Sequence, residues 1–136
     1  MSYAQMMIKA GLDASACLLR RFDIRPETRI LFLIGPGSNG GDGLVMARDL
    51  AERTAAEIRL YMLKERDIDD GPFAGAALKQ LPTTIRHEDR DLSRLSQWAR
   101  EADVIVDALF GIGARLPLGG AAVDILGSAR ACLDAL

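Results

Sequence analysis

The residues best suited to chemistry stand in one glycine-rich stretch, GPGSNGGDG, which covers residues 35–43. An apolar run precedes this stretch and an amphipathic segment follows it. Glycine loses much conformational entropy when it is ordered, so this composition indicates that a ligand approaches the backbone closely. Converging backbone N–H groups at the start of a helix suit an anion such as a phosphate group. A tight turn that binds nothing is the alternative.

Three of these glycines, Gly35, Gly37 and Gly40, match the G-x-G-x-x-G pattern of dinucleotide-binding folds. That pattern also needs an acidic residue about 20 positions further on, at the end of the second strand. The candidate in this sequence, Glu65, lies further away and follows Lys64. An ordinary NAD-dependent dehydrogenase is therefore disfavoured.

Asp42 has two interpretations. In the first turn of a helix it would stabilise the helix through the favourable interaction of a carboxylate with the helix dipole. It could instead orient a hydroxyl or amide group of a ligand. Because a carboxylate in the centre of an anion site would be repelled, we expect Asp42 to lie beside the phosphate position.

Asp107 lies near the end of a second apolar run, VIVDALFG (residues 104–111), where an unpaired buried carboxylate would be costly. Amides of the following loop or a cation could compensate its charge. Asn39 could add a side-chain oxygen from the facing loop. A cluster made only of oxygen atoms, with one carboxylate, suits a monovalent cation such as potassium. A loop cap without a metal is the equal alternative.

The pattern of apolar residues predicts strands that alternate with helices, which favours parallel βαβ units. The expected fold is a three-layer αβα, Rossmann-like, mostly parallel sheet flanked by helices. In the strand order 3-2-1-4 the glycine stretch would face the loop LFGIGARLPLGG (residues 109–120) across a crevice. The expected strands are 29–35, 56–64, 83–87 and 102–111, and the expected helices are 3–22, 41–54, 73–81, 91–101 and 120–134.

Composition excludes several classes of protein. The 136 residues are 49% hydrophobic with a net charge of −2, which allows one domain with a core and gives no basic surface for nucleic acid. No stretch reaches transmembrane length, so we expect a cytoplasmic protein with Cys17 and Cys132 as free thiols. The only histidine, His87, is expected at the surface, and Leu92, Leu95 and Trp98 are expected to face inward.

The stretch GPGSNGGDGLVMARDL, followed later by VDALFGIGARLPLGG, resembles the YjeF N-terminal domain, the family of NAD(P)H-hydrate (NADHX and NADPHX) epimerases. The first motif of that family usually reads G-x-G-N-N-G-G-D-G, so Ser38 stands where an asparagine is common. The segment MMIKAGLDA resembles the first helix of the family, with Lys9 in place of the usual asparagine.

The resemblance implies epimerisation of the R and S forms of hydrated NAD(P)H, which would let a stereospecific dehydratase recover the damaged cofactor. It implies a homodimer, a separate or fused dehydratase, and potassium bound by Asn39 and Asp107. The residues that would contact the hydrated dinucleotide are Ser38, Asn39, Gly40, Gly41, Asp42, Gly111, Ile112, Gly113, Ala114, Arg115, Leu116 and Pro117.

The family continues into a further strand with a D-x-P-S-G motif, and this sequence ends at Leu136 before such a motif. We therefore expect residues 1–136 to be an incomplete domain, and the sequence identifies no catalytic acid or base. Two alternatives stay open. One is a non-catalytic YjeF-like scaffold that retains the nucleotide site, and the other is a fragment of an ordinary NAD(P)-dependent oxidoreductase.

Overall fold

The computed structural model describes residues 2–68, 75–109 and 113–115, and within them a five-stranded sheet. The strands have the order β3-β2-β1-β4-β5, with β1 parallel to both β2 and β4 and β2 parallel to β3. The sheet therefore confirms the predicted strand order and the mostly parallel pairing. Its strands are β1 (Arg29–Ile34), β2 (Glu57–Met62), β3 (Thr83–Ile85), β4 (Val104–Ala108) and β5 (Gly113–Arg115).

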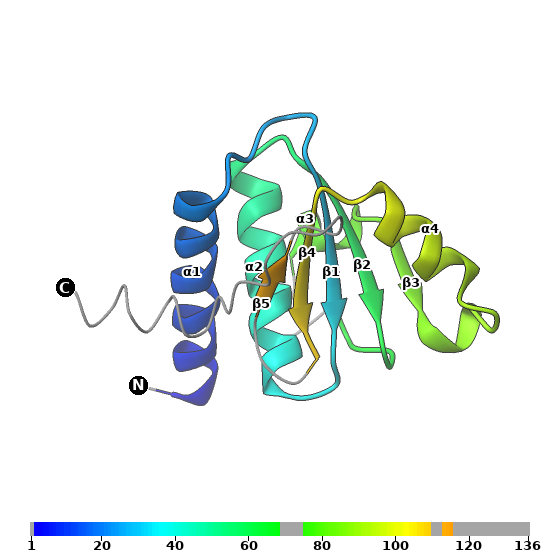
Figure 1. Cartoon of the computed structure of the whole chain (residues 1–136). Coiled ribbons are helices and arrows are strands. Elements are labelled where there is room, and N and C mark those ends of the chain that lie inside the picture. Colours follow the sequence, from blue (N-terminus) through cyan, green and yellow to red (C-terminus); the bar gives the residue numbers. More distant parts are fainter. Residues whose placement is uncertain (1, 69–74, 110–112, 116–136) are drawn as a thin grey trace.

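Helices cover both faces of this sheet and produce three layers (Figure 1). On one face, residues of α1, α2 and α3 share a core with alternate strand residues, and on the other face α4 packs against the remaining strand residues. The helices are α1 (Tyr3–Arg21), α2 (Ser38–Arg53), α3 (Ala76–Lys79) and α4 (Ser93–Glu101), with a 3₁₀ turn at Arg86–Glu88. None of the helices in these described ranges is long and apolar enough to cross a membrane.

The central strand β1 explains why the sheet is buried on both sides. Ile30 and Phe32 belong to the core beneath α1 and α2, whereas Leu31 joins Trp98 and Ile105 in the core beneath α4. A continuous apolar run is what a strand covered on both faces requires. Each such side chain contributes about 1.5–3 kcal/mol when it is fully buried.

Two differences from the sequence prediction bear on the site, namely the start of α2 and the presence of β5. The helix α2 begins at Ser38 and not at residue 41, because the first helical hydrogen bond runs from Gly41 N–H to Gly37 O at 3.2 Å. The strand β5 was not predicted, since its residues were assigned to a loop. It pairs antiparallel with the edge of β4. Its three residues show no alternation of apolar and polar side chains, so the sequence does not indicate a strand there.

Leu92, which was predicted to face inward, is 37% exposed and has a left-handed backbone (φ 61°). Asp89 causes the departure, because its carboxylate accepts hydrogen bonds from the N–H groups of Arg94 and Leu95, both at 3.0 Å, and so caps α4. Trp98 is buried, His87 is exposed and Cys17 is a buried thiol, as expected. The predicted helix 120–134, with Cys132, lies outside the described residues.

Close packing of α2 on the sheet depends on Gly43. A Cβ atom at this position would lie 2.7 Å from Ala108 Cβ and 2.9 Å from Ile34 Cδ1. The helix therefore lies nearer to β1 and β4 than any other residue would allow. Through this contact the start of α2 is held over the carboxyl end of the sheet.

We predict that Gly43→Ala destabilises the fold by up to about 2 kcal/mol, because overpacking costs about 1–3 kcal/mol and the better helix propensity of alanine offsets about 1 kcal/mol of it. The free energy of unfolding in urea measures the change. The double variant Gly43→Ala with Ala108→Gly removes the contacting Cβ atom, so its loss should be smaller than the sum of the single losses. Stability equal to or above that of the unchanged protein would contradict this account.

Candidate functional site

The carboxyl ends of β1, β2 and β4 meet at one edge of the sheet, drawn at the bottom of Figure 1. The first turns of α1 and α2 lie at the same edge. In parallel sheets this edge is where ligands bind, next to the point where the strand order reverses. Here the order reverses between β1 and β4, so the glycine turn after β1 and the end of β4 are neighbours.

The glycine turn after β1 is fixed by three hydrogen bonds and one close packing contact. Gly35 N–H donates to Ala108 O at 3.1 Å, which ties the turn to the end of β4. A Cβ atom on Gly40 would lie only 1.8 Å from Gly35 O, so the start of α2 sits directly against the turn. Arg66 Nη1 donates to Gly35 O at 2.9 Å and to Gly37 O at 2.6 Å.

These contacts leave the first turn of α2 suited to an anion. The carbonyl groups of the turn accept hydrogen bonds from Arg66, whereas the N–H groups of Ser38, Asn39 and Gly40 precede the first helical hydrogen bond and have no acceptor within the helix. The positive end of the helix dipole adds to their effect. Gly41, also predicted to contact ligand, is buried in the same turn.

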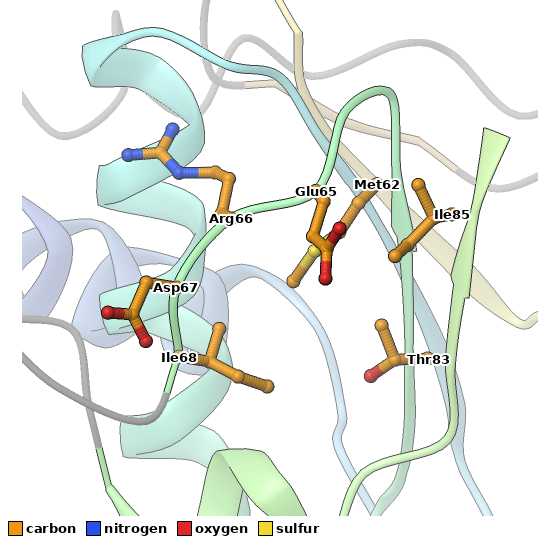
Figure 2. Close-up of a pocket in the computed structure, with 7 residues that line it drawn as sticks. All are labelled: Met62, Glu65, Arg66, Asp67, Ile68, Thr83 and Ile85. Carbon is orange, nitrogen blue, oxygen red and sulfur yellow. The ribbon is translucent and has the colours of Figure 1, made fainter. Parts of the chain in front are cut away.

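Arg66 is the residue of this site that sequence reasoning missed. It lies in a polar segment after β2, where an arginine would be interpreted as a solvated side chain. Figure 2 shows its side chain directed toward the first turns of α2. Burial lowers the pKa of Arg66 from its ordinary value, with a smaller opposing effect from Tyr3. The sequence contains no signal for this role, which only the three-dimensional contacts with Gly35 and Gly37 identify.

The sequence predicted Asp42 in the first turn of α2, and the structure shows that this is wrong. Because the helix begins at Ser38, Asp42 is its fifth residue, and the first turn contains no acidic residue. Helix α1 passes close by, since a Cβ atom on Gly11 would lie 3.0 Å from Asp42 O. Burial raises the pKa of the Asp42 carboxyl group to about 6.

Asp107 lies at the expected edge, one residue before the end of β4, but it is half-buried and not fully buried as the sequence predicted. Its Oδ1 accepts a hydrogen bond from Leu109 N–H at 3.1 Å, so a loop amide compensates part of its charge. Val106 and Ala108 belong to the core beneath α2, so strand alternation places Asp107 on the α4 side of the sheet. Asn39 is the second residue of α2, which lies on the other side of the sheet. A cation shared by Asn39 and Asp107 would have to lie beyond the end of β4.

The residues at this edge offer oxygen ligands for such a cation. Leu109 O faces the glycine turn, 2.7 Å from the position of a Cβ atom on Gly35, and Asp107 supplies a carboxylate. Within residues 2–68, 75–109 and 113–115 no group of three or more His, Cys, Asp and Glu side chains could hold a metal ion. A cation at this edge would be held by the Asp107 carboxylate together with carbonyl and amide oxygens.

The second predicted contact segment is placed only in part. Gly113, Ala114 and Arg115 form β5, and Gly113 pairs with Asp107, which brings this segment to the candidate cation position. The predicted contacts Gly111, Ile112, Leu116 and Pro117 lie outside the described residues.

A cavity of about 480 Å³ lies beside the glycine turn, at the carboxyl ends of β2 and β3. Figure 2 shows Glu65 pointing into it. Sequence reasoning discounted Glu65 because of its distance from the glycines along the chain. The lining residues are Met62, Glu65, Arg66, Asp67, Ile68, Thr83 and Ile85.

Asp42 makes stability dependent on pH. Its pKa rises from 3.8 to about 6 on folding, so the folded chain holds a proton that the unfolded chain has released, and stability falls as the pH rises through this interval. We predict that Asp42→Asn removes this loss, so the advantage of the variant over the unchanged protein grows from pH 4 to pH 6 and is then constant. Urea unfolding across this pH range measures it. The exposed Asp23→Asn should not give this profile, and parallel profiles for Asp42→Asn and the unchanged protein would contradict the prediction.

Comparison with known proteins agrees with this arrangement. A Bifunctional NAD(P)H-hydrate repair enzyme Nnr from Synechocystis is 33% identical over 93% of this chain and 22% of that enzyme. An NAD(P)H-hydrate epimerase from Rhodobacter capsulatus is 33% identical over 85% of this chain and 55% of its own length. The crystal structure of yeast ynu0, YNL200c, superposes with a TM-score of 0.62 and 25% identity, over 82% of this chain and 48% of that one.

The chain thus spans about half or less of the length of these proteins. Residues 3–132 match the family described as YjeF-related protein N-terminus, which covers nearly the whole sequence. The fold and the glycine turn agree with this family match, and the chain belongs to the YjeF-related protein N-terminus family.

Proposed function

We propose that the chain is an NAD(P)HX epimerase domain, which interconverts the R and S epimers of hydrated NAD(P)H. The observation that carries the proposal is the glycine turn, whose carbonyls are held by Arg66 while the first amides of α2 remain available at the carboxyl edge of the sheet. That edge is where a dinucleotide would bind. The names of the relatives from Synechocystis and Rhodobacter support the substrate class.

In this proposal the diphosphate of the dinucleotide accepts hydrogen bonds from the N–H groups of Ser38, Asn39 and Gly40. Asp42, which lies one turn further along α2, is close to the diphosphate without facing it. The hydrated nicotinamide ring then lies over the ends of β1 and β4. The resemblance to the family implies that the segment from Gly111 to Pro117, of which the structure describes Gly113–Arg115, contacts the dinucleotide.

A potassium ion is proposed near the end of β4, held by the side-chain oxygens of Asn39 and Asp107. It would supply a positive charge next to the diphosphate and fix the position of the ring. The family relationship also suggests a homodimer and a cytoplasmic location. A dehydratase would act on the epimerised product, either as a separate protein or as a fused domain of the kind that the name of the bifunctional relative indicates.

The direct test is to mix the chain with purified S-NADHX or R-NADHX and to follow their interconversion by chromatography. The two forms epimerise spontaneously, so the measured quantity is the rate above this background. We expect acceleration from both directions toward the same equilibrium. Binding of nucleotide without acceleration would instead favour a non-catalytic module that retains the nucleotide site.

A matched pair of aspartates tests the cation site. We predict that Asp107→Asn lowers nucleotide affinity about tenfold or more and removes the difference between potassium and lithium buffers, because the carboxylate is the charged ligand. Titration with ADP-ribose in the two buffers measures both effects.

Asp103→Asn is the control. Asp103 also accepts a hydrogen bond from a backbone N–H group, that of Arg29 at 2.9 Å, but it lies at the opposite end of β4. The two variants make the same change in charge. Equal behaviour of the two would show that Asp107 has no role in a cation site.

A further inference from the structure

The cavity at the ends of β2 and β3 lies next to the proposed diphosphate position, and the epimerase proposal assigns no part of the ligand to it. Its volume of about 480 Å³ is within the range of about 300–1,000 Å³ typical of small-molecule sites. Arg66 connects the two places, because it lines the cavity and its guanidinium group donates to the carbonyls of the glycine turn.

The wall of the cavity suits a flat apolar group. Met62 belongs to the core beneath α2, and Ile68 and Ile85 pack against that core from the sides, so their side chains form an apolar surface at the cavity. In Figure 2 these side chains and Thr83 surround a single space. A purine base could lie against such a surface, with the hydroxyl group of Thr83 within the same lining.

The charge of the cavity suits a sugar with free hydroxyl groups. Glu65 is exposed, points into the cavity and makes no hydrogen bond or ion pair with any part of the chain that the structure describes. A carboxylate is an acceptor only, and vicinal ribose hydroxyls are donors that it can bind. Asp67, the other carboxylate of the lining, points away from this space in Figure 2, so Glu65 is the carboxylate that faces it.

The same charges disfavour a phosphate group on the ribose. Two cations flank Glu65 along the chain. Arg66 directs its guanidinium group to Gly35 O and Gly37 O and not into the cavity, and Lys64 is not among the lining residues. A 2′-phosphate in the cavity would therefore lie near the Glu65 carboxylate, and the two negative charges would repel each other.

We propose that this cavity binds the adenosine half of the hydrated dinucleotide, with the Glu65 carboxylate accepting hydrogen bonds from the ribose hydroxyls, and that the site therefore selects the form without a 2′-phosphate. The inference rests on the proposed function for the identity of the ligand. It makes Glu65 a residue that determines specificity between NADHX and NADPHX.

Calorimetric titration of the 136-residue chain with AMP and with adenosine 2′,5′-bisphosphate tests the inference, since both probes carry the adenosine half alone. We expect AMP to bind about tenfold or more tightly than the bisphosphate. Glu65→Gln should reduce this preference about fivefold or more, mainly by strengthening binding of the bisphosphate. Glu52→Gln, which removes the same charge from an exposed position near the other end of α2, should leave the preference unchanged.

The outcomes separate this inference from the proposed function. Equal affinities for the two probes, tighter binding of the bisphosphate, or the same preference in Glu65→Gln as in the unchanged protein would overturn the role of Glu65, whatever the epimerase assay gives. Failure to accelerate epimerisation, together with a preference for AMP that depends on Glu65, would overturn the proposed function and leave the adenosine site supported. Failure to bind either probe would overturn the site.

Discussion

The approach of Gly40 to the carbonyl oxygen of Gly35 is the contact on which the proposed site depends. A side chain at position 40 would place its Cβ atom 1.8 Å from that oxygen, so only glycine lets α2 begin so close to the end of β1. The helix start must be this close if its amides are to reach a ligand at the sheet edge. Gly43 repeats the requirement one turn later, where α2 contacts Ala108. The glycines of the motif thus have a packing role as well as a place at the ligand.

The close contact between the glycine turn and α2 brings carbonyl groups of the turn next to the helix start, and Arg66 offsets their negative potential. Carbonyl oxygens near a helix start would oppose an approaching anion, because they add negative potential where the amides provide positive potential. By donating to Gly35 O and Gly37 O, the guanidinium group offsets this potential and satisfies both acceptors. The turn, the helix start and Arg66 therefore act as one unit, although Arg66 lies on the far side of β2 in the sequence.

How far the sequence predicted this protein depends on the range of the contacts involved. The strands β1 and β4 were predicted well, since an apolar run buried on both faces is visible locally. The position of the glycine motif at the carboxyl edge of the sheet was also predicted correctly. Arg66, β5 and the left-handed Leu92 were missed, because each depends on a partner that is distant in sequence or on a cap that competes with helical periodicity. The first residues of α2 were assigned to a loop because glycine has low helix propensity, which tertiary packing overrode.

Charges alternate along the carboxyl edge in an order that matches the parts of a dinucleotide. Glu65 stands at the cavity, Arg66 and the first amides of α2 follow, and Asp107 lies at the end of β4. Ribose hydroxyls, a diphosphate and the hydrated nicotinamide ring follow one another in the same order along the ligand. Asp107 would repel the diphosphate unless its charge were offset, and the single amide hydrogen bond from Leu109 offsets only part of it. A bound monovalent cation would supply the remainder without reversing the sign of the site, which a divalent ion beside a lone carboxylate would do. The proposed potassium ion thus follows from placing a half-buried carboxylate next to an anion-binding helix.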